Sequence, residues 1–215
     1  MTTKSSRLTR RGLWSVAGLL VVLLVGGAAR TTILTSLGRA MATSDPLAPA
    51  DLAVLTPESG DGGEIEVSDL FRDHVVTRVA VLVPQPTIAE AELERRGVRS
   101  HAPPLDVLVQ LGVPPNAIVA VPAGEGGTTE STKALAAWCR GRAADRIIVI
   151  VSPTHARRYR RALARVWQGP GPLPAIRTTR FDEFRAETWW STRRTLRNGL
   201  EELQKLLLDY VSHPL

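Results

Sequence analysis

Short apolar runs rich in β-branched residues recur along this chain, and segments with helical spacing lie between them. The clearest run is Ile147–Val151, where five β-branched residues follow one another. Uninterrupted apolar strands of this kind are typical of parallel sheets that are buried on both faces. The alternation of strand and helix therefore predicts an α/β domain, a Rossmann-like three-layer sandwich with a mostly parallel sheet.

The same patterns place the individual elements. We expect strands at residues 51–56, 78–83, 117–121, 146–151 and, more weakly, 175–179. Helices are expected at residues 67–74, 87–96, 104–111, 128–140, 154–167 and 187–210. In the last of these helices, leucines recur at near-helical spacing from Leu196 to Leu207, so we expect it to close one face of the sheet.

The N-terminal region predicts a membrane anchor. Four basic residues precede an uncharged run, residues 12–29, which falls within the roughly 17 to 25 residues that span a bilayer. The positive-inside rule then makes residues 1–11 a cytoplasmic tail and places the domain outside a plasma membrane that the chain crosses once. Residues 30–50 are expected to be a linker and residues 51–215 the α/β domain. A cleaved signal peptide is the alternative, because small residues precede Arg30.

Charge and cysteine content narrow the function. The net charge of the 215 residues is +6, yet residues 31–150 carry fifteen acidic and ten basic groups, and aromatic residues make up only 5%. An acidic middle and few rings for base stacking argue against a nucleic-acid partner. Cys139 is the only cysteine, which excludes an internal disulfide and a cysteine metal cluster.

A histidine lies at the junction between the strand at 146–151 and the next helix. Ligands of parallel sheets bind outside the carboxyl ends of the strands, where unpaired N–H groups of helix N-termini favour anions. Ser152 and Thr154 follow the strand, and His155 opens the helix. At 100° per residue His155 faces inward, Arg158 lies on the border, and the other arginines, among them Arg161, face largely outward. We interpret His155 and Arg158 as an anion-binding pair, with a structural histidine as the alternative.

Two further strand ends carry candidate ligand residues. Thr128, Thr129 and Glu130 open a helix behind a glycine-bearing loop, as in a phosphate cradle, although the spacing fits neither the P-loop nor the dinucleotide fingerprint. After the first strand, Glu58 and Asp61 stand in an acidic, glycine-rich loop, where a carboxylate serves as a general base or a metal ligand. Both segments are also compatible with ordinary caps and turns.

Four segments together resemble the YdcF/SanA/ElyC-like family of bacterial envelope proteins. They are GVPPNAIVAVP, TTESTKALAAW, RIIVIVSPTHARRYRRAL and WWSTRRTLRNGLEELQKLLLDY. The resemblance covers about residues 51–210 and aligns His155 and Arg158 with the histidine and arginine of the family. It implies a Rossmann-like domain, often behind one membrane helix, linked to envelope integrity and to peptidoglycan or lipid-carrier metabolism. The sequence departs from the family at TPESGDGG, where a Gly-Gly turn is usual, and at Ser131, where asparagine is usual.

These observations predict an extracytoplasmic envelope protein that binds, and in one version processes, a phosphorylated cell-wall precursor or polyprenyl-phosphate carrier. Alternatives are a protein that binds a nucleotide-type ligand such as S-adenosylmethionine, and a non-catalytic scaffold whose basic C-terminal third meets anionic lipid or polymer. No nucleophile elbow is visible, so the reaction and any cofactor stay open. His155 is the candidate catalytic residue, and the candidate ligand contacts are Glu58, Thr128, Thr129, Glu130, Ser152, Thr154 and Arg158.

Overall fold

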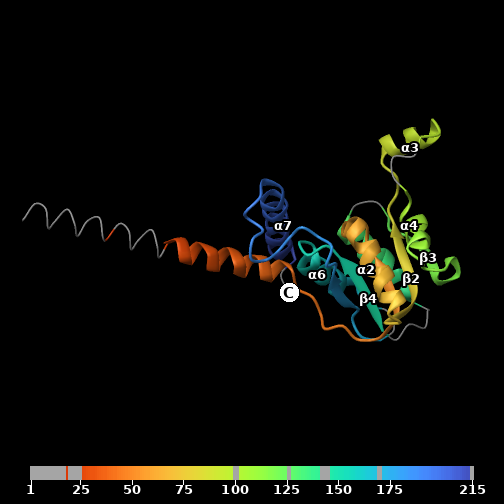
Figure 1. Cartoon of the computed structure of the whole chain (residues 1–215), viewed down its shortest axis with the longest axis horizontal. Coiled ribbons are helices and arrows are strands. Elements are labelled where there is room, and N and C mark those ends of the chain that lie inside the picture. Colours follow the sequence, from red (N-terminus) through yellow and green to blue (C-terminus); the bar gives the residue numbers. More distant parts are fainter. Residues whose placement is uncertain are drawn as a thin grey trace, which may run out of the picture.

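A computed structural model of the chain describes residue 18 and residues 26–98, 102–124, 127–140, 146–168 and 171–213. Five strands form one parallel sheet in the order β3-β2-β1-β4-β5 (Figure 1). The strands are β1 (Ala50–Leu55), β2 (Val76–Val83), β3 (Ile118–Pro122), β4 (Ile147–Val151) and β5 (Ala175–Thr178). Each of the five predicted strands is therefore confirmed, with small differences at the ends.

The strand order creates a switch point between β1 and β4. Ala53 of β1 pairs with Val79 of β2 on one side and with Ile148 of β4 on the other. The chain leaves β1 toward β2 and leaves β4 toward β5, in opposite directions along the sheet. Connections that diverge in this way open a crevice at the carboxyl ends of the two strands. The segments after β1 and β4 therefore border the crevice.

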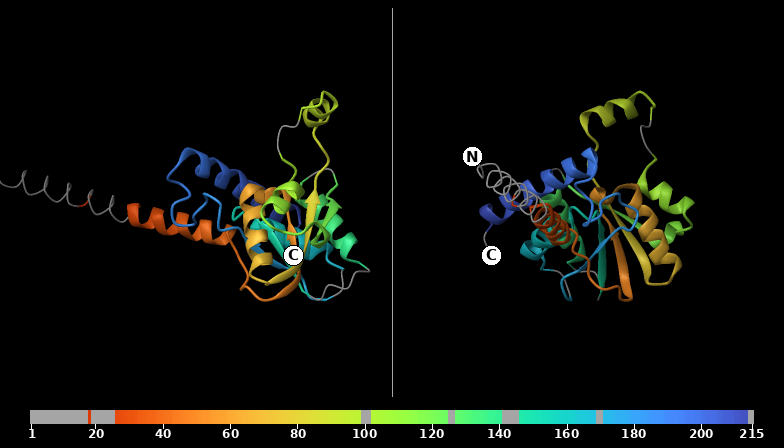
Figure 2. Two further views of the ribbon diagram at one scale, coloured as in Figure 1. Left: turned by 45° about the vertical axis from the view of Figure 1, so that its right-hand side comes forward. Right: turned by 60° about the vertical axis from the view of Figure 1, so that its left-hand side comes forward.

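Helices cover both faces of the sheet, which confirms the predicted three-layer, Rossmann-like arrangement (Figure 2). One apolar core joins the sheet to α5 (Thr128–Cys139) and α6 (Ala156–Val166). The other joins it to α2 (Gly60–Arg72) and α4 (Pro104–Gln110). Strands buried on both faces need no polar side, which explains why β4 reads as a continuous apolar run.

Helix α2 begins several residues earlier than the sequence predicts. A short 3-10 helix, η1 (Pro57–Ser59), follows β1, and α2 starts at Gly60. A Cβ atom at Gly63 would lie 2.0 Å from Ser59 Oγ and 2.8 Å from Leu55 Cδ1. Glycine is thus required for the first turns of α2 to approach the end of β1. These glycines conceal the helix, because they interrupt its apolar spacing.

Three short helical segments, α3, α4 and η2, lie between β2 and β3 in the described part of the chain. Helix α3 (Ile88–Arg95) begins at a capping box formed by Thr87 and Glu90, and it projects from the body of the domain (Figure 1). Its first residue, Ile88, is 92% exposed. The 3-10 helix η2 (Pro115–Ala117) leads into β3. Both α3 and α4 lie within the predicted ranges.

Helix α7 (Arg193–Ser212) corrects two predictions. It starts at Arg193 and not at residue 187. Thr192 caps it by accepting a hydrogen bond from the Thr195 N–H at 3.2 Å. It also does not close a face of the sheet, because α5 and α6 on one side and α2 and α4 on the other already cover both faces. Instead α7 packs beside α6 and joins a third apolar cluster around Trp189.

The segment before β1 also differs from the prediction. Residues 26–41 are helical, so the linker expected at residues 30–50 is wrong for its first part. Contacts with the segment before α7 hold this helix on the domain. Met41 is 1% exposed beside Trp189, and Trp189 Nε1 donates to the Leu34 carbonyl at 2.8 Å. The predicted tail and most of the predicted anchor lie outside the described residues. Among those described, no helix is both long and apolar enough to cross a bilayer.

Candidate functional site

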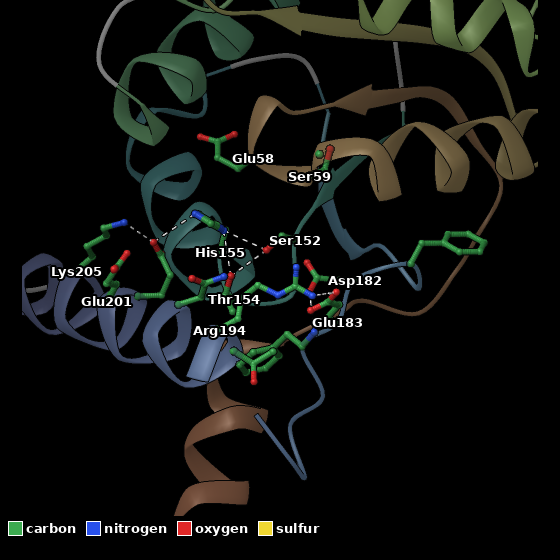
Figure 3. A pocket seen from close by; sticks show the side chains of 16 residues that line it. Glu58, Ser59, Ser152, Thr154, His155, Asp182, Glu183, Arg194, Glu201 and Lys205 are labelled. Carbon is green, nitrogen blue, oxygen red and sulfur yellow. Dashed lines mark hydrogen bonds and ion pairs between the residues drawn. The ribbon is translucent and has the colours of Figure 1, made fainter. Parts of the chain in front are cut away.

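A cleft of about 480 Å³ opens at the carboxyl edge of the sheet (Figure 3). Four segments surround it: η1 after β1, the turn between β4 and α6, the loop after β5, and α7. This is the switch-point crevice expected from the strand order. The cleft therefore lies where the sequence predicted a ligand.

His155 lies in this cleft with both ring nitrogens engaged (Figure 3). Its Nδ1 is 3.1 Å from Ser152 Oγ and 3.2 Å from Thr154 Oγ1, while Nε2 is 3.3 Å from Glu202 Oε1. An ionised carboxylate only accepts hydrogen bonds, so this contact places a proton on Nε2. In the neutral ring, Nδ1 then accepts a hydrogen bond from one of the two hydroxyls.

Glu202 of α7 is the centre of the charge network. Its side chain is only 4% exposed. It accepts hydrogen bonds from Arg158 Nε at 3.0 Å and from Lys205 Nζ at 2.7 Å. Burial by itself would raise the pKa of Glu202. The hydrogen bonds from His155 and Lys205 and the charge of Arg158 outweigh burial and lower that pKa to about 2. Glu202 is thus an anion at neutral pH, and it holds three basic side chains in place.

Arg158 links this centre to the end of β1. Its Nη1 donates to Thr128 Oγ1 at 2.7 Å, and the Thr128 hydroxyl in turn donates to Glu58 Oε1 at 3.3 Å. The other carboxylate oxygen of Glu58 is buried and has no hydrogen-bond partner within the described part of the chain. Burial and the nearby Glu58 carboxylate raise the pKa of the Tyr159 phenol, which therefore stays protonated.

A second hollow of about 250 Å³ adjoins the cleft: Lys205 lines both spaces, and Arg158 lines the hollow. The start of α5 borders it through Thr128 and Thr129, and Arg165 supplies a third cation against the carboxylate of Asp209. The contacts of Arg158 to Glu202 and Thr128 use three of its five N–H donors. Two donors are therefore left on the side chain that borders this basic hollow.

The cleft and the basic hollow differ in charge. The carboxylates that line the cleft outnumber its cations, Arg194 and Lys205; they are Glu58, Asp182, Glu183, Glu201 and Glu202. In the basic hollow the cations outnumber the one carboxylate. A phosphate therefore fits the basic hollow better than the centre of the cleft, because like charges repel in a partly desolvated site.

The structure divides the predicted site residues between these two spaces. Glu58, Ser152, Thr154 and His155 line the cleft, whereas Thr128, Thr129 and Arg158 line the basic hollow.

Glu130 lines neither space. It forms an ion pair with Lys133 at 2.8 Å on the surface of α5. Asp61 stands in the first turn of α2 and also lines neither space. Among the described residues no group of three or more His, Cys, Asp or Glu side chains is placed to hold a metal ion.

Sequence reasoning missed Glu202 and Lys205 and misplaced Arg161. The side chain of Arg161 is only 6% exposed and pairs with Asp209 at 2.6 Å, because α7 covers the side of α6 that we expected to face solvent. One signal in the sequence was available: Glu202 falls on the same side of α7 as the small buried residues Thr195 and Gly199. A charged residue on the inward side of a helix indicates an ionic partner.

Comparisons with known proteins do not assign this chain to a family. No protein-family model matches it, and no curated protein matches it either. Among solved structures, the X-ray crystal structure of glucose-6-phosphate 1-dehydrogenase from Mycobacterium avium is similar with 13% sequence identity and a TM-score of 0.38. The match covers 71% of this chain and 34% of that one, so the chain spans about a third of the length of the dehydrogenase. A likeness this distant carries no argument about activity.

Proposed function

We propose that this protein is a membrane-anchored, extracytoplasmic envelope protein that binds a phosphorylated cell-wall precursor or polyprenyl-phosphate carrier. One observation carries the proposal: a basic hollow lined by Arg158 and Lys205 lies at the start of α5, and Lys205 also lines the cleft that contains His155. The basic tail, the apolar run at residues 12–29 and the family resemblance support the location.

The basic hollow offers the phosphate three kinds of donor. Arg158 presents its two remaining N–H groups, and Lys205 and Arg165 add positive charge at the border. Thr128 and Thr129 begin α5, so their backbone N–H groups lie at the positive end of that helix. Glu202 prevents Arg158 from swinging away, so the arginine fork meets the phosphate already oriented.

A processing role is favoured by the arrangement of Ser152, His155 and Glu202. The carboxylate of Glu202 keeps the proton on His155 Nε2, which leaves Nδ1 to accept a proton from a neighbouring hydroxyl. That hydroxyl, or a water bound in its place, becomes a better nucleophile as it loses its proton. In this second candidate function, the basic hollow binds the phosphate of the substrate. The reacting group of the same substrate extends into the cleft.

A ligand panel tests the proposal on the full chain in detergent. Geranylgeranyl phosphate should raise the melting temperature, because a ligand at 100 times its dissociation constant stabilises a protein by about 2.7 kcal/mol. Geranylgeraniol, which has the same hydrocarbon and no phosphate, should leave the melting temperature unchanged. An equal shift with the alcohol would refute phosphate recognition. A shift with S-adenosylmethionine alone would favour the nucleotide-type alternative, and no shift with any ligand would favour a scaffold.

A further inference from the structure

The side of α7 that faces away from α6 carries exposed apolar residues. Leu200, Leu207, Leu208 and Val211 are 53%, 64%, 57% and 73% exposed. Their spacing places them on one side of the helix, opposite the buried Glu202. We call this group the outer face of α7. Large apolar side chains gathered on one exposed helix face mark an interaction surface.

Positive charge continues the outer face toward the start of the helix. Arg193 and Arg197 lie within the same angular range, and both are exposed. Such a face suits the interface of an anionic bilayer, because burial of the apolar residues and attraction of the arginines to anionic lipid both favour binding there.

The position of α7 fits a membrane on that side. Helix α7 and the helix at residues 26–41 lie together at one end of the domain, and α3 projects from the opposite end (Figures 1 and 2). The helix at 26–41 exposes Ile33, at 59%, and Leu37, at 37%. In the sequence this helix directly follows the apolar part of the predicted anchor, residues 12–25. An anchor leaving the domain there would bring α7 to the same membrane.

The outer face also meets the basic hollow. Leu208 belongs to both: it is exposed on α7, and it lines the hollow beside Lys205 and Arg165. A lipid whose phosphate occupies the hollow would thus keep its hydrocarbon in the bilayer beside Leu208. The hollow is consequently reached from the direction in which a bilayer would lie.

We propose that the outer face of α7 docks in the interface of an anionic bilayer, so that lipid phosphates enter the basic hollow from the membrane. The choice of ligand rests on the proposed function. The docking of α7 is tested separately from the ligand, because it depends on the leucines and arginines of the outer face and on the predicted anchor.

Fluorescence quenching by lipids tests the docking. The full chain is reconstituted into phosphatidylcholine vesicles that contain a third of phosphatidylglycerol, with an environment-sensitive probe at Leu207→Cys. A matched probe at Ile88→Cys reports on the far end, where Ile88 is 92% exposed. The native Cys139 is buried and stays unlabelled. Nitroxide-labelled acyl chains should quench the probe at 207 several-fold more than the probe at 88, and less strongly once phosphatidylglycerol is omitted.

Each other outcome overturns a named part of the proposal. Equal quenching at both positions refutes docking while the anchor still stands, and failure to enter vesicles refutes both. Disulfide-linked dimers of the unlabelled Leu207→Cys variant would show that a second copy covers the face. Quenching that does not depend on phosphatidylglycerol would show that the arginines do not contribute to docking.

A second variant separates docking from phosphate binding. Leu207→Asp should leave binding of soluble geranyl phosphate unchanged and weaken binding of a vesicle-embedded prenyl phosphate about tenfold. Loss of both would place Leu207 in the phosphate site itself and refute the separate docking face.

Discussion

The two sides of α6 are built from opposite kinds of interaction. Toward the sheet, Ala156, Tyr159 and Leu163 are completely buried in an apolar core. Toward α7, Arg158 and Arg161 bind the carboxylates of Glu202 and Asp209. Apolar burial is non-directional and depends little on pH or salt, whereas ion pairs respond to both. The sheet side therefore maintains the fold, and the α7 side positions the groups that we propose to bind the phosphate.

The largest effect is expected from damage to the sheet side. Leu163→Ala should lower the free energy of unfolding by about 2 to 5 kcal/mol, because Leu163 is fully buried and its truncation leaves a cavity. Urea unfolding at low and high salt measures the loss, which should be the same at both. A loss below about 1 kcal/mol would show that α6 is not held by its apolar side.

Acid should act on the α7 side. The pKa of Glu202 is lowered from 4.5 to about 2, so its stabilisation is complete above pH 4.5 and is lost as the pH falls toward 2. The loss in unfolding free energy should be on the order of 3 kcal/mol. Glu202→Gln should start from a lower stability and lose less over this range, although Asp209, whose pKa is also lowered, still contributes.

Glu201→Gln is the matched control for that experiment. Glu201 is the neighbouring carboxylate and is 55% exposed. Its variant should keep the acid dependence of the wild-type chain. If Glu202→Gln and Glu201→Gln unfold alike in acid, the network around Glu202 does not hold α7.

A smaller effect is expected where α7 meets the aromatic cluster. A Cβ atom at Gly199 would lie 2.4 Å from Trp189 Cε3. Gly199→Ala should therefore destabilise by about 1 to 3 kcal/mol through overpacking, although alanine favours a helix by about 1 kcal/mol. Gln204→Ala, on the exposed side of α7, should be nearly neutral. If Gly199→Ala unfolds at a higher temperature than the wild-type chain, there is room for a methyl group between α7 and Trp189.

The smallest effect is expected at Glu130. It forms a surface pair with Lys133, in which the two side chains are 40% and 55% exposed. Glu130→Ala should change the unfolding free energy by about 1 kcal/mol or less and leave the affinity for prenyl phosphate unchanged. Thr128→Val, two residues earlier in α5, should weaken that affinity because Thr128 holds Arg158. Isothermal titration measures the affinity of both variants. A large loss of affinity in Glu130→Ala would show that Glu130 belongs to the ligand site.

The sheet side could be predicted from sequence because its signals are local. Five apolar runs give five strands, and the position of His155 just after β4 places it at the crevice. The α7 side could not be predicted in the same way. Glu202 lies 44 positions beyond Arg158, and the leucine spacing of α7 indicates a helix without indicating what it packs against. The early start of α2 was concealed by glycines that are needed for close packing against β1.

Isothermal titration of geranylgeranyl phosphate into the full chain and two single variants tests the central claim most directly. Arg158→Lys should weaken binding at least about tenfold, because an ammonium cannot contact Glu202, Thr128 and a phosphate with one planar fork. Arg157→Lys is the matched control: Arg157 is the neighbouring residue, contacts Tyr210 and lines neither space, so its variant should bind as tightly as the wild-type chain. Equal affinities for all three proteins, or an equal loss in both variants, would contradict a phosphate site at Arg158.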